Sequence, residues 1–177
     1  CQTIGSPCNL TNGFANEMAQ ISAANGDILY MCAGACDGSG AATIGTVELD
    51  GSLYTIPSGS SYANALTITT YPGESITLYR VQLYSNEHYL ILSNFTVDDV
   101  GSANATVRIA ETGTHHIRLS NLIMTGATVT GGLAFSNATH DHEVLNCESY
   151  GNTAGGATVH GIYVTLGSNN ILIDGGA

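Results

Sequence analysis

Residues 115–126 read HHIRLSNLIMTG, and part of this stretch recurs along the chain. Its middle, LSNL at 119–122, has a close copy 27 residues upstream, LSNF at 92–95. A partial copy, VLNC at 144–147, lies 25 residues downstream. A short motif that returns at an interval in the twenties indicates stacked structural repeats rather than a catalytic signature.

The repeat extends over the C-terminal two thirds of the sequence. Short segments of alternating apolar residues begin at Val81, Val107, Leu133 and Ile162, at spacings of 26, 26 and 29 residues. Each is followed by a second apolar segment. No long helical pattern separates them, which excludes a βαβ sheet, and signals for two-residue hairpins are weak. A parallel β-helix satisfies both observations, because each coil stacks its strands on those of the next coil.

This arrangement predicts which side chains face the core. The expected inward residues are Val81, Leu83, Val107, Ile109, Leu133, Phe135, Ile162 and Val164 on one sheet, Leu90, Leu92, Ile117, Leu119, Val144, Ile171 and Ile173 on the next, and Phe95, Val97, Leu122, Met124 and Cys147 after the turn. Nothing after Ile173 is expected to cover the last apolar layer.

Four features resemble the right-handed parallel β-helix superfamily, the pectate-lyase-like fold. They are the coil length, ITTYPGESITLY at 68–79, HGIYV at 160–164, and an Asn after the second strand in three coils. The resemblance covers roughly residues 26–177 and implies an all-β solenoid, which we expect to have about five to six coils. It also implies that Asn94, Asn121 and Asn146 form a hydrogen-bonded ladder, which we expect to be buried in the turn.

The N-terminal segment, residues 1–25, is expected to cap the solenoid of residues 26–177. Residues 12–24, NGFANEMAQISAA, place Phe14, Met18 and Ile21 on one helical stripe. In the superfamily that the chain resembles, a helix in this place covers the apolar end of the coils.

Charge excludes two classes of partner. The 177-residue chain has three Arg, no Lys and fourteen acidic residues, which gives a formal net charge of −11. Nucleic acids and acidic membranes are bound mainly through Lys and Arg, so neither is an expected partner. No apolar run is long enough to cross a bilayer.

Cysteines and sequons favour a secreted glycoprotein. Cys1, Cys8, Cys32 and Cys36 suggest disulfides in an oxidising compartment, with three pairings open and a metal site between Cys32 and Cys36 as the less favoured alternative. Cys147 is expected to be a buried thiol. A lipid anchor at Cys1 competes with its disulfide.

Four N-x-S/T sequons begin at Asn9, Asn94, Asn104 and Asn137. A buried ladder residue cannot carry a glycan, so we expect Asn94 to be unmodified. Asn9, Asn104 and Asn137 lie outside the ladder and are the candidate glycosylation sites.

The resemblance also indicates where chemistry would lie. Lyases of this fold pair an acidic Ca²⁺ site with an Arg or Lys base, and hydrolases use clustered Asp carboxylates, usually facing outward from the first sheet. The outward residues expected there are Gln82, Tyr84, Arg108, Ala110, Ala134, Ser136, Tyr163 and Thr165. They include no carboxylate, and we interpret Asp98-Asp99 as a solvated turn. We therefore expect no cofactor, and a Ca²⁺ ion only if the protein were a lyase.

A polar constellation is expected on the second sheet instead. His116 and Arg118 would face outward from one coil, with Asp141 and Glu143 in the matching slots of the next. Arg118 could act as a base or sugar clamp with Glu143, but an ion-pair ladder between coils is the favoured interpretation. His140-Asp141-His142 resembles a metal tripeptide, although His142 falls in an inward slot. His160 is interpreted as scaffold.

These observations leave two classes of function. We favour an extracellular structural or adhesive protein that is glycosylated and associates end to end, with itself or with further coils of a longer chain. The alternative is a carbohydrate-active enzyme, a polysaccharide lyase or glycoside hydrolase, or a fragment of one.

Overall fold

A computed structural model of the chain describes residue 21 and residues 26–32, 40–99, 104–153 and 159–175, without the side chains of 41–48. The expected capping helix at 12–24 lies outside these ranges apart from Ile21, which packs against the core. Cys1, Cys8, Cys36 and Asn9 also lie outside them. Cys32 is buried, and the disulfide pairing stays a prediction.

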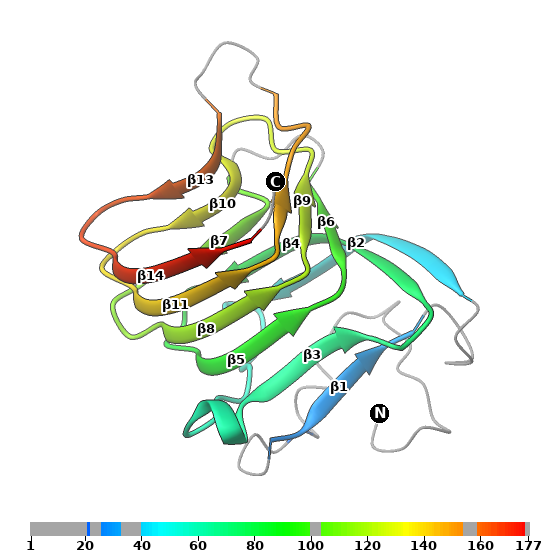
Figure 1. The fold of residues 1–177 in the computed structure, drawn as a ribbon, viewed down its shortest axis with the longest axis horizontal. Helices are drawn as coiled ribbons and strands as arrows, with labels where there is room; N and C mark the ends of the chain where they lie inside the picture. Colours follow the sequence, from blue (N-terminus) through cyan, green and yellow to red (C-terminus); the bar gives the residue numbers. More distant parts are fainter. Residues whose placement is uncertain (1–20, 22–25, 33–39, 100–103, 154–158, 176–177) are drawn as a thin grey trace.

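The described chain is a parallel β-solenoid, as the sequence predicts (Figure 1). Six strands form one sheet, which we call the β5 face. In spatial order its strands are β1 (Ile28–Met31), β3 (Leu66–Thr70), β5 (His88–Ser93), β8 (His115–Ser120), β11 (His140–Leu145) and β14 (Asn169–Asp174).

A second sheet supplies the other two sides of each coil. The β6 face holds β6 (Thr96–Asp98), β9 (Ile123–Thr125) and β12 (Glu148–Ser149), and the β7 face holds β7 (Val107–Ile109), β10 (Gly131–Phe135) and β13 (His160–Val164). Two long strands, β2 (Ala41–Asp50) and β4 (Ser75–Leu83), run across both faces. The first half of β4 pairs with β6 and its second half pairs with β7. The short helix η3 (Tyr62–Asn64) precedes β3.

The described strands form about four complete coils, slightly fewer than the five to six that the sequence predicts. Each complete coil visits the β7, β5 and β6 faces in turn, for example through β7, β8 and β9. Before the first complete coil come β1 and the start of β2. After the last come β13 and β14, with no third strand in the described part of the chain.

The predicted core is confirmed except at its last layer. The inward residues of the three central coils form one buried cluster, in which Val81, Leu92, Ile117 and Phe135 are each 0% exposed. Burying a side chain of this size contributes about 1.5–3 kcal/mol. Val164 and Ile173, inward in pattern, are 44% and 49% exposed because they stand at the edge strands β13 and β14.

The Asn ladder is present, but it lies on the surface. Asn146 Nδ2 donates to Asn121 Oδ1 at 2.8 Å, and Asn121 Nδ2 donates to Asn94 Oδ1 at 3.0 Å. All three residues are exposed and left-handed, with φ of 60°, 53° and 51° along the chain. Asn tolerates this backbone better than most residues, so the turn and the ladder both favour it. The expectation of a buried ladder is therefore wrong.

This position changes the reason for expecting no glycan on Asn94. The side chain is accessible, but its Nδ2 donates to Thr69 Oγ1 at 3.1 Å and to Ser93 Oγ at 3.3 Å. A glycan attached to Nδ2 would replace one of its two hydrogens, so one of these two hydrogen bonds would be lost. The expectation for Asn94 stays a prediction, now based on hydrogen bonding instead of burial.

We expect Asn121→Gly to lower the free energy of unfolding by about 1–2 kcal/mol, because the variant keeps the left-handed turn and loses two ladder bonds. Asn121→Ala should cost about 1 kcal/mol more, from backbone strain. Asn86→Gly is the matched control, since Asn86 is exposed with a φ of 68° and lies outside the ladder. Urea unfolding measures all three. Equal effects at residues 86 and 121 would show that the ladder contributes nothing.

Candidate functional site

A backbone irregularity near the start of four β5-face strands, β5, β8, β11 and β14, determines which polar side chains face outward. Tyr89, His116, Asp141 and Asn170 occupy equivalent positions and all have a φ between 48° and 59°. The left-handed residue interrupts strict alternation, so it and its predecessor both face outward before an inward residue follows. His140 consequently lies on the outer surface beside Asp141, where simple alternation would place it inside.

Arg118 and Glu143 form the predicted pair between coils. They are register partners on β8 and β11, and Arg118 Nε donates to Glu143 Oε2. The side chains are 31% and 26% exposed, and the guanidinium lies 4.3 Å from the centre of the Tyr62 ring. Burial, followed by the charge of Glu143, raises the pKa of Tyr62 to about 12. The pair is thus a partly shielded ion pair resting on a neutral tyrosine, which agrees with the structural interpretation.

His116 and Asp141 do not join that pair. His116 Nδ1 lies 2.7 Å from His115 Nδ1, and its ring centre lies 4.5 Å from that of Tyr89. Asp141 accepts from His140 at 2.7 Å and from Asn170 at 3.0 Å. The hydrogen bond from His140 lowers the pKa of Asp141. The four predicted residues therefore belong to separate networks on one face.

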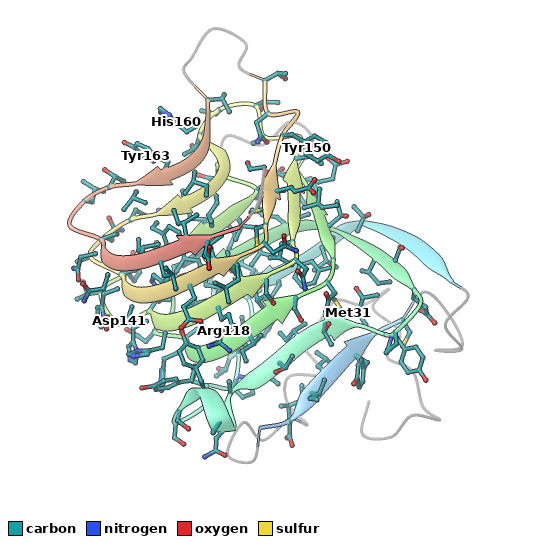
Figure 2. The ribbon with its side chains drawn as sticks, viewed as in Figure 1. Met31, Arg118, Asp141, Tyr150, His160 and Tyr163 are labelled. Carbon is teal, nitrogen blue, oxygen red and sulfur yellow. The ribbon has the colours of Figure 1, made fainter. Side chains whose placement is uncertain are left out.

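A hollow on the β7 face was not singled out from the sequence. Its volume is about 320 Å³, and its lining residues are Asn104, Ala105, Arg108, Thr130, Ala134, Ser136, Tyr163, Thr165 and Leu166. Arg108, Ala134 and Tyr163 are successive register partners on β7, β10 and β13. The small Ala134 leaves a gap between the two large side chains. Figure 2 shows Tyr163 beside His160 on β13, away from Arg118 and Asp141 on the β5 face.

Arg108 differs from the other two arginines in its partners. Arg80 and Arg118 each form an ion pair with a carboxylate. Within the described residues, Arg108 has no carboxylate partner, and its guanidinium lies 5.9 Å from the centre of the Tyr84 ring. The sequence contained a signal for this, because the register neighbours of Arg108 are Gln82 and Ala134, neither of which is acidic.

The rest of the β7 face is less open than alternation suggests. Gln82, Ala110 and Ala134 point away from the core but are 3%, 0% and 4% exposed. Gln82 Nε2 donates to the carbonyl oxygen of Ala105, which belongs to a connecting loop. A loop therefore covers this face at Gln82, and the hollow lies beside it over β7, β10 and β13.

The interpretation of Asp98-Asp99 as a solvated turn is wrong for Asp99. Its side chain is 0% exposed, and Arg80 donates to it from Nε at 2.9 Å and from Nη2 at 3.2 Å. Arg80 lies in β4 where the β6 and β7 faces meet. This bidentate pair fixes that corner of the solenoid, which is a structural role.

The remaining histidine predictions have mixed outcomes. His142 is inward and 1% exposed, as its slot predicts. His160 is exposed and stacks on Tyr163 at 5.0 Å between ring centres. Over the described ranges, no group of three or more His, Cys, Asp or Glu side chains is arranged to hold a metal ion.

Cys147 is a buried free thiol, as predicted, and burial raises its pKa. A search of the described segments found no helix with the length and apolar character needed to cross a membrane.

Comparisons with family models, with curated proteins and with solved structures returned no match.

We expect Asp99→Ala to lower the free energy of unfolding by about 3 kcal/mol, because it leaves the mostly buried Arg80 without its bidentate partner. Asp98→Ala is the matched control and should change stability by less than about 1 kcal/mol, since Asp98 is only half-buried. Chemical denaturation of both variants tests this, and similar losses would contradict a special role for Asp99.

Proposed function

We propose that the chain is an extracellular structural or adhesive solenoid that holds an acidic glycan in the hollow on the β7 face. The observation that carries this proposal is Arg108, a guanidinium without a carboxylate partner among the described residues, in a hollow whose other lining side chains are polar, aromatic and aliphatic. In a chain with a net charge of −11, such a group is a specific point of attraction for an anion.

The lining of the hollow matches the groups of a uronic acid. A guanidinium binds a carboxylate through two parallel hydrogen bonds, which favours Arg108 as the contact for the sugar carboxylate. The hydroxyls of Thr130, Ser136 and Thr165 can exchange hydrogen bonds with sugar hydroxyls. Tyr163, 37% exposed, presents a ring on which a sugar can stack.

The same lining favours binding over cleavage. Hydrolysis of a glycoside requires two carboxyl groups beside the scissile bond, and no Asp or Glu lines the hollow. A lyase of the type that the fold suggests would need carboxylates for Ca²⁺ next to Arg108. A carbohydrate-active enzyme is the alternative function, and it is supported only by the shape of the hollow.

Secretion and glycosylation belong to the proposal as well. Asn104 is exposed at the edge of the hollow and is the favoured glycosylation site in the described part of the chain. Asn137 is half-buried and donates from Nδ2 to Glu111 Oε1 at 3.2 Å, so modification there would replace a hydrogen-bond donor.

We further propose that the last described coil is covered by a coil of a second copy. Val164, Leu166, Leu172 and Ile173 are each more than 40% exposed there, beside the outer edges of β13 and β14. Edge strands with apolar side chains are templates for further strand pairing. Further coils of the same chain would use the same surface.

Calorimetric titration with a uronic acid trisaccharide tests the glycan site. We expect binding that Arg108→Gln weakens at least about tenfold, or roughly 1.4 kcal/mol, while Arg118→Gln, on the β5 face, leaves affinity unchanged. The neutral trisaccharide of the same linkage should bind much more weakly. Absent binding, or equal losses in both variants, would contradict the site, and release of shortened products would favour the enzyme.

Sedimentation and electron microscopy test the association. We expect oligomers that grow with protein concentration, and we expect Val164→Lys with Ile173→Lys to yield monomers because two charges cannot be buried in an apolar contact. Leu53→Lys is the control, since Leu53 is 68% exposed in the turn after β2. Monomers of the unsubstituted protein at all concentrations would exclude end-to-end association.

A further inference from the structure

Five of the six histidines gather where three neighbouring strands of the β5 face begin. His88 belongs to β5, His115 and His116 to β8, and His140 and His142 to β11. We call these five residues the histidine band. Arg118 and Asp141, labelled in Figure 2, mark its position on the solenoid. The glycan proposal makes no use of any of them.

The outer members form a column of stacked rings. His88 and His115 lie 5.0 Å apart between ring centres at 19°, and His115 and His140 lie 5.3 Å apart at 6°. All three are half-buried. Two imidazolium rings stacked at such distances would repel each other.

One contact in the band requires a neutral ring. His115 Nδ1 and His116 Nδ1 are 2.7 Å apart, a distance at which one nitrogen donates and the other accepts. An imidazolium carries a proton on both nitrogens, so two charged rings would point hydrogen at hydrogen. The contact therefore breaks when the second ring of the pair takes up a proton.

His142 makes a second contact of this kind inside the core. Its Nδ1 accepts from the backbone nitrogen of Ile117 at 3.2 Å, and its ring stacks on Phe135 of β10 at 5.0 Å. The side chain is 1% exposed, and Nε2 has no hydrogen-bond partner. Protonation at Nδ1 would remove the acceptor for Ile117 and place a charge in an apolar core.

The groups that face the histidine band can neutralise little of the positive charge that protonation of its rings would add. Asp141 already accepts from His140, and Glu143 is paired with Arg118, which adds a positive charge of its own. Tyr62 of η3 and Tyr89 of β5 are uncharged contacts, and Asn170 of β14 is a neutral partner of Asp141. Glu87 directs its carboxyl into the turn before β5, toward Ser85 and Thr114.

We propose that the histidine band is an acid-sensitive lock between β8 and β11, which holds the C-terminal coils in place at neutral pH and releases them when its rings are protonated. Both contacts that need a neutral ring involve β8, and the one in the core joins it directly to β11. The coils N-terminal to β5 contain no member of the band in the described residues.

The pKa shifts of the buried rings make the folded state less stable as the pH falls, as the lock requires. Burial lowers the pKa of His142 from 6.5 to about 3, and burial followed by the neighbouring histidines lowers that of His115. A histidine with a lowered pKa in the folded state adds its full stability above pH 6.5. That stability is lost as the pH falls from 6.5 toward the folded-state pKa, since only the open form takes up the proton.

The test is thermal unfolding of the whole chain between pH 8 and pH 5, combined with amide hydrogen exchange corrected for intrinsic rates. We expect the melting temperature to fall by about 5–10 °C. Exchange should rise at least tenfold at acid pH in residues 131–150 and 160–175, and change little in β3. His142→Leu should remove more than half of the pH dependence. It should fold, because Leu90, Ile117 and Ile171 hold the equivalent inward positions.

Two further variants complete the design. His115→Asn, which copies Asn169 at the equivalent position of β14, should also flatten the pH profile, and it serves if His142→Leu does not fold. His160→Gln removes the one histidine outside the band and should follow the unsubstituted protein. A melting temperature independent of pH would overturn the lock. So would parallel pH profiles for all variants, or an increase in exchange spread evenly along the chain.

Discussion

Each coil of this solenoid must place its inward side chains directly upon those of the coil before it. Parallel pairing fixes that alignment residue by residue, as in Leu90, Leu92 and their partners Ile117 and Leu119. The left-handed Asn that follows β5, β8 and β11 makes the alignment repeatable, since it turns the chain at the same point in three coils. The ladder of amide hydrogen bonds then penalises any slip, because a shift by one residue would separate all the amides at once.

The same constraint explains why the polar chemistry of the β5 face separates into two networks. A second left-handed residue, such as His116 or Asp141, recurs near the start of β5, β8, β11 and β14 and turns two consecutive side chains outward. Beyond it the ordinary alternation resumes and pairs Arg118 with Glu143. The histidine rings that precede this point stack on one another instead. Residues that look like one cluster in the sequence therefore form separate hydrogen bonds, Arg118 with Glu143 and Asp141 with His140.

The sequence was sufficient for the fold and the core because both follow from periodicity. Leu119, Val144 and Phe135 are inward by simple counting, and the ladder positions follow from the repeat of Asn. Counting along a strand failed where the backbone leaves the regular strand conformation. It also failed where a side chain from another part of the sequence covers a residue. His140 faces outward because Asp141 is left-handed, and Asp99 is buried because Arg80 reaches it from another coil. The left-handed position recurs in four coils, but it is filled by Tyr89, His116, Asp141 and Asn170, so it has no constant residue type that the sequence could report. The pair between Arg80 and Asp99 has no counterpart in the other described coils.

The three arginines of this chain differ in whether a described carboxylate neutralises them, and therefore in their expected roles. Arg80 is buried against Asp99, and Arg118 rests between Glu143 and Tyr62, so each contributes mainly to structure. Arg108 has the polar neighbours Gln82 and Tyr84 instead of a carboxylate. A solenoid repeats its backbone in every coil, but it need not repeat its charges. The proposed glycan site lies at Arg108, the arginine that has no carboxylate partner among the described residues.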